Sequence, residues 1–317
     1  MFIMSIRVSF LVASVIAAAA PAAADCPALV AAFDHAVATR SIDGELNAML
    51  AIGKSIGCNG RTDEFRRKLI NSMINLAGDP QVSPADQKKA LDTAVSTIGI
   101  GGTWREAEHL ADFFARRNDN SKALEWYEKS LSFVSQRPVE PATAEDLQLL
   151  KTRASAAKLL ASNDDGGKKS ADLAKSTRGM DGQVGGIYSR DLLRGAEVEA
   201  VPLPINFITG ETTFTPVGEK AAAELAEAIK QQNVHVVTLV GHTDPRGEHQ
   251  YNMALSMHRA EALRAYLQSH GISAQINVGG KGPDQPFDVS VLGRPVSQDE
   301  EWALDRRVEW LRDPATE

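Results

Sequence analysis

The sequence predicts an α+β protein, in which an all-helical N-terminal part precedes a mixed sheet with helices. Residues 27–161 place apolar side chains at helical spacing, with little strand-like alternation. Residues 198–317 instead alternate strand-like runs with long helical segments, which is typical of a βαβαβ layer with a mixed sheet. A chain of 317 residues is long enough for two such domains.

Residues 1–24 have the three parts of a secretory signal peptide. Arg7 precedes an apolar run over 8–20, and small residues follow up to Ala24. The run is shorter than the roughly 20 residues that cross a bilayer, which disfavours an uncleaved anchor. We therefore expect cleavage after Ala24, a mature chain without a membrane span, and a location in the periplasm.

The sequence contains two cysteines, Cys26 and Cys58, and both belong to the expected mature chain. In an oxidising compartment such a pair favours one disulfide. Closing a loop of about 30 residues stabilises a fold by about 3–4 kcal/mol in the chain-entropy model. A metal site is not expected, because no histidine pair lies near either cysteine.

The helical part, residues 25–161, divides into pairs of amphipathic helices. Ser83 is the expected N-cap of one of them, and Pro84 suits its first position. The expected helices cover 28–38 and 45–56, 64–77 and 84–98, 104–117 and 121–134, and finally 143–161.

The third pair resembles a tetratricopeptide repeat, in which small residues let two helices pack closely. Stacked repeats would offer a concave surface to a protein partner, here an unidentified envelope protein. A generic helical bundle is the alternative. The positions that carry the resemblance are Ala107, Leu110, Ala111, Phe114, Ala123, Tyr127 and Ser130.

Residues 162–197 are polar and rich in glycine, and they predict a flexible linker that lets the two domains act at different positions. The second domain, residues 198–317, follows. Its expected strands cover 198–207, 235–240, 274–279 and 306–311, and its main helices cover 216–232 and 248–270.

One charged side chain interrupts the apolar face of the helix expected over 248–270. With Leu255 at zero and 100° per residue, Arg259 lies at about 40° and Asn252 at about 60° on that face. An unpaired guanidinium there would be costly. Because helical side chains lean toward the N-terminus, Arg259 is expected to point toward Asp244 in the preceding turn.

An arginine and an aspartate that converge where a helix begins suit a small zwitterion. Arginine can hold a carboxylate through two parallel hydrogen bonds, and Asp244 can accept hydrogen bonds from an ammonium group. The first backbone amides of the helix add donors. A structural ion pair between Asp244 and Arg259, without a ligand, is the alternative.

The same residues belong to a longer pattern, Thr-Asp-x-x-Gly-x-x-x-Tyr-Asn-x-x-Leu-Ser-x-x-Arg-Ala, which runs from Thr243 to Ala260. Ile205-x-Phe207, Gly280-x-Gly282 and the closing segment 305–309 add further matches. Together these motifs resemble the OmpA-like family, named for the C-terminal peptidoglycan-binding domain of outer membrane protein A. The resemblance covers residues 199–312.

The resemblance implies that the second domain binds diaminopimelate in the stem peptide of peptidoglycan. The side-chain end of this amino acid carries one ammonium and one carboxylate. In the family the aspartate and arginine of the motif hold that end, which carries over to Asp244 and Arg259. The complete set of expected ligand-binding residues is Asp244, Arg259, Asn252, Thr243, Gly247 and Arg307.

The sequence departs from the family pattern in two places. Asp305 stands where the family has asparagine, and it adds negative charge beside Arg307. The segment 288–302 is longer than a minimal family loop and is acidic near its end. Both departures affect the expected contribution of Arg307 to ligand binding, and neither changes the central pair Asp244 and Arg259.

Composition and spacing disfavour other functions. The net charge is −7 and no basic stripe is present, which argues against nucleic-acid binding. His242 and Asp244 lack a third metal ligand at a suitable spacing. Ser256 and His258 lie roughly 200° apart around a helix and cannot form a catalytic triad. We therefore expect that the protein is not an enzyme and that it binds no cofactor.

The leading interpretation is a periplasmic, cell-wall-associated protein that binds peptidoglycan non-covalently. Within the periplasm, this interpretation includes a position at the inner face of the outer membrane. The helical repeats would bind a protein partner. One alternative is a helical-repeat scaffold whose C-terminal domain has lost ligand binding. Another is a wall hydrolase, which would require turnover of the cell wall.

Overall fold

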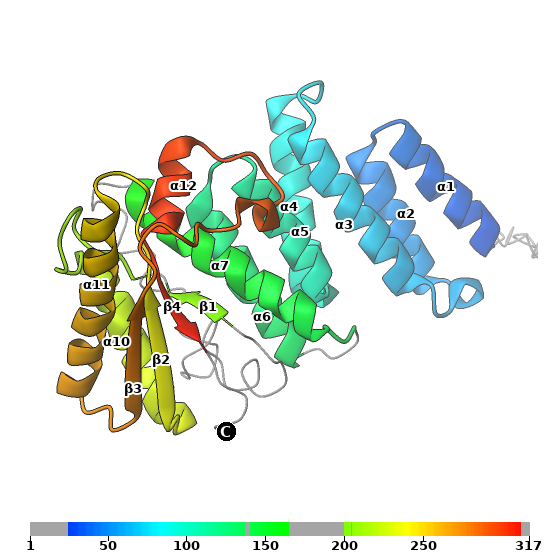
Figure 1. Ribbon diagram of the computed structural model, residues 1–317. Helices are drawn as coiled ribbons and strands as arrows, with labels where there is room; N and C mark the ends of the chain where they lie inside the picture. The colour runs from blue at the N-terminus through cyan, green and yellow to red at the C-terminus, as the bar shows by residue number, and fades with distance from the viewer. Residues whose placement is uncertain (1–24, 137–139, 165–199, 204, 312–317) are drawn as a thin grey trace, which may run out of the picture. The chain divides into compact units, whose positions relative to one another are not determined.

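The computed structural model describes residues 25–136, 140–164, 200–203 and 205–311 (Figure 1). The expected signal peptide lies outside these residues, as does the expected linker apart from residues 162–164, which end a helix. The chain divides into two compact units, one up to Arg66 and one from Arg67 onward.

The described residues of the first unit, 25–66, form two helices, a short 3-10 turn and the start of a third helix. These are α1 (Cys26–Ala38), α2 (Ile42–Lys54), η1 (Ile56–Cys58) and the beginning of α3 (Thr62–Gly78). The expected disulfide is present between Cys26 and Cys58, whose Cα atoms are 5.1 Å apart. It joins the start of α1 to the turn that follows α2, so it closes the helix pair at one end.

The helical part of the second unit contains the remainder of α3 and four further helices. They are α4 (Pro84–Gly101), α5 (Trp104–Ala115), α6 (Asn120–Gln136) and α7 (Ala144–Asp164). The expected cap of α4 is confirmed, since Ser83 Oγ accepts a hydrogen bond from Asp86 N at 3.2 Å. Every expected helix is therefore present, with ends displaced by a few residues.

The helices α5 and α6 pack closely, as their small residues predict. Ala107, Ala111 and Ala123 are all fully buried. Across the pair, Ser130 Oγ donates to Trp104 O at 2.7 Å, and Tyr127 Oη donates to an Asp112 carboxylate oxygen at 2.5 Å. These contacts fit the tetratricopeptide-like arrangement.

The C-terminal part forms the mixed sheet expected of an α+β protein. The strands lie in the order β1-β4-β2-β3; β2 and β3 are parallel, while β4 is antiparallel to β1 and β2. Its elements are β1 (Ala200–Leu203), α10 (Pro216–Gln232), β2 (Val236–Gly241), α11 (His249–Ser269), β3 (Gln275–Gly280), η3 (Val289–Leu292), α12 (Gln298–Asp305) and β4 (Val308–Leu311).

The helix α11 lies against β2 and β3 (Figure 1). The strand β1 is shorter than the expected 198–207, because the chain next forms a small hairpin closed by a bridge between Phe207 and Phe214. The backbone amide of Ile208 also donates to Thr213 O at 2.9 Å. This hairpin loop, residues 208–213, borders the site described below.

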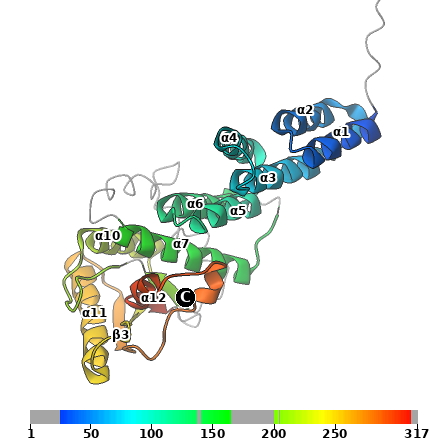
Figure 2. The same ribbon diagram turned by 90° about the horizontal axis from the view of Figure 1, so that it is seen from above.

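The helix α7 packs against the C-terminal sheet and against α12, and the two views show α7 and α12 side by side (Figures 1 and 2). Lys158 Nζ pairs with a Glu224 carboxylate at 2.6 Å, and Arg153 Nε donates to Val291 O at 2.7 Å. The sequence had predicted domains that act at different positions, and this contact was not expected. The shared buried cluster contains Ala156, Leu159, Leu160, Phe287, Leu292, Ala303 and Leu304.

The segment 288–302 explains how this contact forms. This segment, which the sequence predicts to be longer than a minimal family loop, folds into η3 and most of α12. Leu292 of this segment is buried in the cluster with α7, and Val289, Val291 and Val296 pack around it. The segment therefore supplies an apolar surface that α7 covers.

Candidate functional site

The site begins in the turn that follows β2. The backbone amide of Thr243 donates to Gly282 O at 2.9 Å, and Asn252 Nδ2 donates to Asp244 O at 3.3 Å and Arg246 O at 2.9 Å. Gly247 has φ +93°, a left-handed conformation that suits glycine. Asn252 and Gly247 thus hold the turn in place, and Asp244 is fixed at the start of α11.

The carboxylate of Asp244 is held by two arginines, although neither is Arg259. Arg246 N and Nε donate to Oδ1, each at 3.1 Å. Arg246 Nη2 and Arg306 Nη1 both donate to Oδ2 at 2.7 Å. Burial alone would raise the pKa of Asp244, but the hydrogen bonds from Arg246 and Arg306 outweigh it and lower this pKa to about 2.

Arg259 is 2% exposed, as expected for a side chain on the core face of α11. Its Nε donates to Glu211 O at 3.1 Å and its Nη2 to Ile208 O at 3.5 Å, so the hairpin loop covers it. Burial lowers the pKa of Arg259 to about 10, and the Arg306 charge acts in the same direction while Asp244 opposes it. The guanidinium therefore stays charged at neutral pH.

Asp244 and Arg259 consequently lie close enough to interact electrostatically, without a direct ion pair in the described structure. The alternative of a simple structural pair between them does not match this geometry. Each has other partners: Asp244 is bound by arginine side chains, and Arg259 by backbone carbonyl groups.

One of the expected site residues, Arg307, has its partners elsewhere. Arg307 Nε donates to a Glu309 oxygen at 2.8 Å, and His242 Nε2 lies 3.2 Å from the other oxygen of the same carboxylate. Arg307 and Glu309 are two residues apart on extended chain and so share a face, away from Asp244. Thr243 is buried, and its hydroxyl has no hydrogen-bond partner among the described residues.

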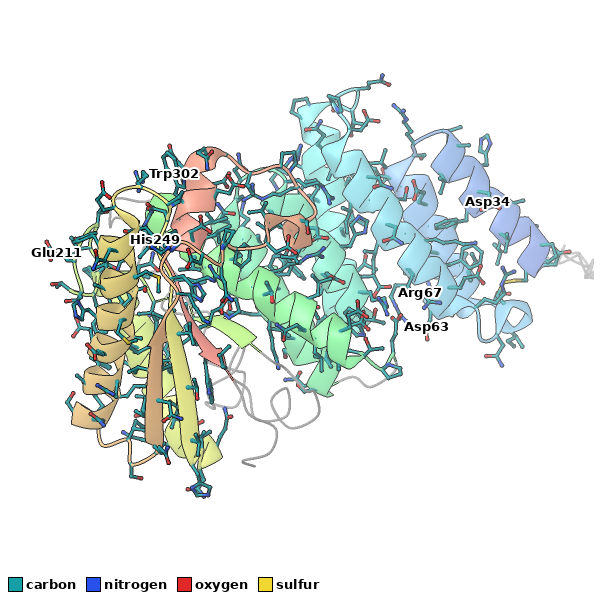
Figure 3. All side chains as sticks on the ribbon, in the orientation of Figure 1. Asp34, Asp63, Arg67, Glu211, His249 and Trp302 are labelled. Carbon is teal, nitrogen blue, oxygen red and sulfur yellow. A yellow bond between two sulfur atoms is a disulfide. The ribbon has the colours of Figure 1, made fainter. Side chains whose placement is uncertain are left out.

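Sequence reasoning missed Arg246, Arg306 and Trp302. The guanidinium of Arg246 lies 4.4 Å from the ring of Trp302, which belongs to α12. Trp302, His249 and Glu211 all lie around the end of the C-terminal domain where α11 begins (Figure 3). The position of Arg246 two residues after Asp244 is a usable signal, because such a spacing lets an arginine fold back onto the carboxylate.

A cavity of about 470 Å³ adjoins the loop that covers Arg259. Tyr251 Oη donates to Gly210 O at 3.1 Å on its wall, and 55% of Tyr251 is exposed. The cavity lies between the hairpin loop and the first turns of α11. Its lining residues are Gly210, Glu211, Thr212, Thr213, Tyr251, Ala254, Leu255 and His258.

The residues considered for catalysis have structural partners. Ser256 Oγ accepts from Gly282 N at 2.9 Å and donates to Met253 O at 2.9 Å. Across the described ranges, no three His, Cys, Asp or Glu side chains are grouped so that they could hold a metal ion. Nor does any helix in these ranges have the length and hydropathy needed to span a bilayer.

The stability of the fold should depend on pH through Asp244. Its folded pKa is lowered from the ordinary 3.8 to about 2, so its stabilising effect is present above pH 4 and is lost as the pH falls toward 2. Glu309 titrates in the same range. Urea unfolding of wild type and Asp244→Asn should therefore show a stability difference that shrinks below about pH 4. A difference independent of pH would contradict the assignment.

Comparison with known proteins gives a family for the C-terminal part. A model of the OmpA family matches residues 206–293. The peptidoglycan-associated lipoprotein of Pseudomonas aeruginosa is 37% identical over 93 residues, which cover 26% of this chain and 52% of that protein. The probable lipoprotein YiaD of Escherichia coli is 28% identical over 136 residues, covering 39% and 59%.

Among solved structures, the peptidoglycan-associated lipoprotein from Burkholderia pseudomallei is 23% identical, with a TM-score of 0.29. The alignment covers 37% of this chain and 92% of that one. The chain spans about half the length of the curated relatives it matches. The family model identifies residues 206–293 as an OmpA domain, and an N-terminal helical domain precedes it.

Proposed function

We propose that this chain is a periplasmic protein that binds peptidoglycan non-covalently and catalyses no reaction. Its OmpA domain would recognise the side-chain end of diaminopimelate. The observation that carries this proposal is the pair Asp244, in the turn before α11, and Arg259, in the middle of α11. The two side chains have opposite charges and are not paired with each other. Similarity to peptidoglycan-associated lipoproteins supports it.

Arg259 has the donors that a carboxylate ligand requires. Its described hydrogen bonds use Nε and one Nη2 position, and Nη1 forms none within the described ranges. A guanidinium has five N–H donors, so several remain for a ligand. A carboxylate at this position would receive charge-assisted hydrogen bonds, which are stronger than those Arg259 makes to neutral carbonyl groups.

The helical part would bind an envelope protein. The tetratricopeptide-like pair α5 and α6 supports this role, because stacked repeats of this kind offer a concave surface to a protein partner. Because α7 is packed against the OmpA domain, such a partner would be held next to the cell wall. The expected signal peptide supports a location in the periplasm. Peptidoglycan binding would place the protein at the cell wall, including the part next to the inner face of the outer membrane.

One observation favours the alternative of a scaffold that has lost its ligand. Asp244 already accepts hydrogen bonds from two arginines, as expected for a structural ion cluster. Under that alternative, the OmpA domain would serve to support the helical part, and removal of Asp244 or Arg259 would leave wall binding unaffected.

Cosedimentation with purified diaminopimelate-type sacculi separates these functions. We expect Asp244→Ala and Arg259→Ala each to weaken binding at least about tenfold, since each removes a charge-assisted contact. Arg259→Lys keeps the charge but loses the planar fork, and should also bind more weakly. Circular dichroism checks that each variant is folded.

Matched controls remove charges elsewhere. Arg264 is a partly exposed arginine on α11, and Asp92 is an exposed aspartate on α4. Arg264→Ala and Asp92→Ala should bind sacculi like the wild type. Undiminished binding by both Asp244→Ala and Arg259→Ala would reject the proposed site, whereas clearance of sacculi by the wild type would show a hydrolase.

A further inference from the structure

The acceptor capacity of Asp244 is fully used in the structure. A carboxylate offers about four lone-pair positions. Asp244 receives hydrogen bonds from Arg246 N and Nε on one oxygen, and from Arg246 Nη2 and Arg306 Nη1 on the other. An incoming ammonium group therefore has to displace one of the arginine side chains before it can contact Asp244.

Arg246 is the side chain that can leave. Its side chain is 50% exposed, against 24% for Arg306, and it belongs to the turn after β2, whereas Arg306 caps the end of α12. Arg246 is held on Asp244 by its own hydrogen bonds and by the ring of Trp302. Trp302 in turn is positioned by α12, whose Ala303 and Leu304 are buried against α7.

We propose that Arg246 determines the specificity of the Asp244 site by competing with the cationic group of the ligand. A ligand that brings only an ammonium group releases Arg246 into water without a new partner. A ligand that brings an ammonium and a neighbouring carboxylate pairs with Asp244 and also offers an anion to the released guanidinium. The competition therefore selects for zwitterionic ends, by weakening binding of the simple cation.

The charge of the cluster supports this selection. Asp244 is surrounded by Arg246, Arg306 and, within electrostatic range, Arg259. In direct contact, one carboxylate thus meets two guanidinium groups, so a ligand carboxylate improves the local charge balance and an additional lone ammonium worsens it. Asp299 and Asp305 also lie within electrostatic range of the cluster. The inference rests on the proposed function, since it concerns the ligand of the same site.

Calorimetric titration of the full chain with two tripeptides tests the inference. Both have the sequence L-Ala-γ-D-Glu-X, where X is meso-diaminopimelate or L-lysine, and they differ by one side-chain carboxylate. The wild type should prefer the diaminopimelate peptide at least about tenfold. In Arg246→Ala, affinity for the lysine peptide should rise roughly three- to tenfold, which narrows the preference by a similar factor.

Two further variants sharpen the test. Trp302→Ala leaves every charge in place but removes the ring that holds Arg246, so it should shift the preference in the same direction by a smaller factor. Arg264→Ala removes a partly exposed arginine from α11 and should keep the wild-type preference.

The outcomes are distinguishable. Wild-type preference for the diaminopimelate peptide, with the same preference in Arg246→Ala, would overturn the role of Arg246 and keep the proposed function. Weaker binding of the lysine peptide by Arg246→Ala would also overturn it. Failure of both the wild type and Arg246→Ala to bind either peptide would remove the proposed function, and the inference with it.

Discussion

The Gly241→Ala variant is expected to lose at least about 3 kcal/mol of stability, the upper range for overpacking. A Cβ atom at residue 241 would lie 2.0 Å from the backbone oxygen of Ser256 and 2.8 Å from its carbonyl carbon. Both atoms belong to the backbone of α11, so a side-chain rotation cannot relieve the clash. The helix would have to move away from β2.

This close approach also builds the site. Gly241 ends β2 three residues before Asp244, and Ser256 precedes Arg259 by three residues on α11. Contact between the strand end and the helix therefore brings the two charged residues near each other. A variant that separates them should lose wall binding together with stability.

Urea unfolding followed by tryptophan fluorescence measures the effect, since Trp310 is buried in this sheet. Gly279→Ala is the matched control on the parallel neighbour β3, because the nearest atom to its added Cβ is Val240 Cγ2 at 3.8 Å, an ordinary contact. Equal stability of the two variants would show that α11 does not approach β2 as described.

Removal of the disulfide by Cys26→Ser with Cys58→Ser should destabilise the first unit by about 3–4 kcal/mol in the chain-entropy model. The bond joins residues 32 positions apart, so its loss frees a long loop in the unfolded state. The unit that contains it ends at Arg66 and holds few helices, and a small core offers little compensation.

Hydrogen exchange of the α1 and α2 amides measures this change. The double variant should exchange faster there, and dithiothreitol should reproduce the effect in the wild type but add nothing in the variant. Sacculus binding should remain, because Asp244 and Arg259 belong to the second unit. Unchanged protection of α1 and α2 would contradict the predicted stabilisation.

The sequence predicted the burial of Arg259 but not its hydrogen-bond partners. Helical periodicity placed Arg259 on the core face of α11, and the structure confirms that burial. The same reasoning could not identify the partners of Arg259, because Glu211 and Ile208 bind through backbone carbonyl groups, which any residue carries. The ligand itself stays a prediction.

The sequence of α7 contains a signal for its contact with the OmpA domain, which the prediction of amphipathic helices did not use. Ala156, Ala157, Leu159 and Leu160 are all buried, which leaves this part of α7 apolar on nearly every side. A helix that is apolar all round is covered by more than one partner. Its partner in the segment 288–302 lies far away in the sequence, so local periodicity could not identify it.

The sequence by itself determined the helices and strands, the cysteine pair and the motif that carries Asp244 and Arg259, because local spacing and residue chemistry decide these features. Only the tertiary structure decided that Arg306, and not Arg307, faces Asp244, and that Trp302 holds Arg246 beside it. Neighbouring residues of an extended chain point in different directions, and the direction each takes depends on strand register and on packing between distant segments.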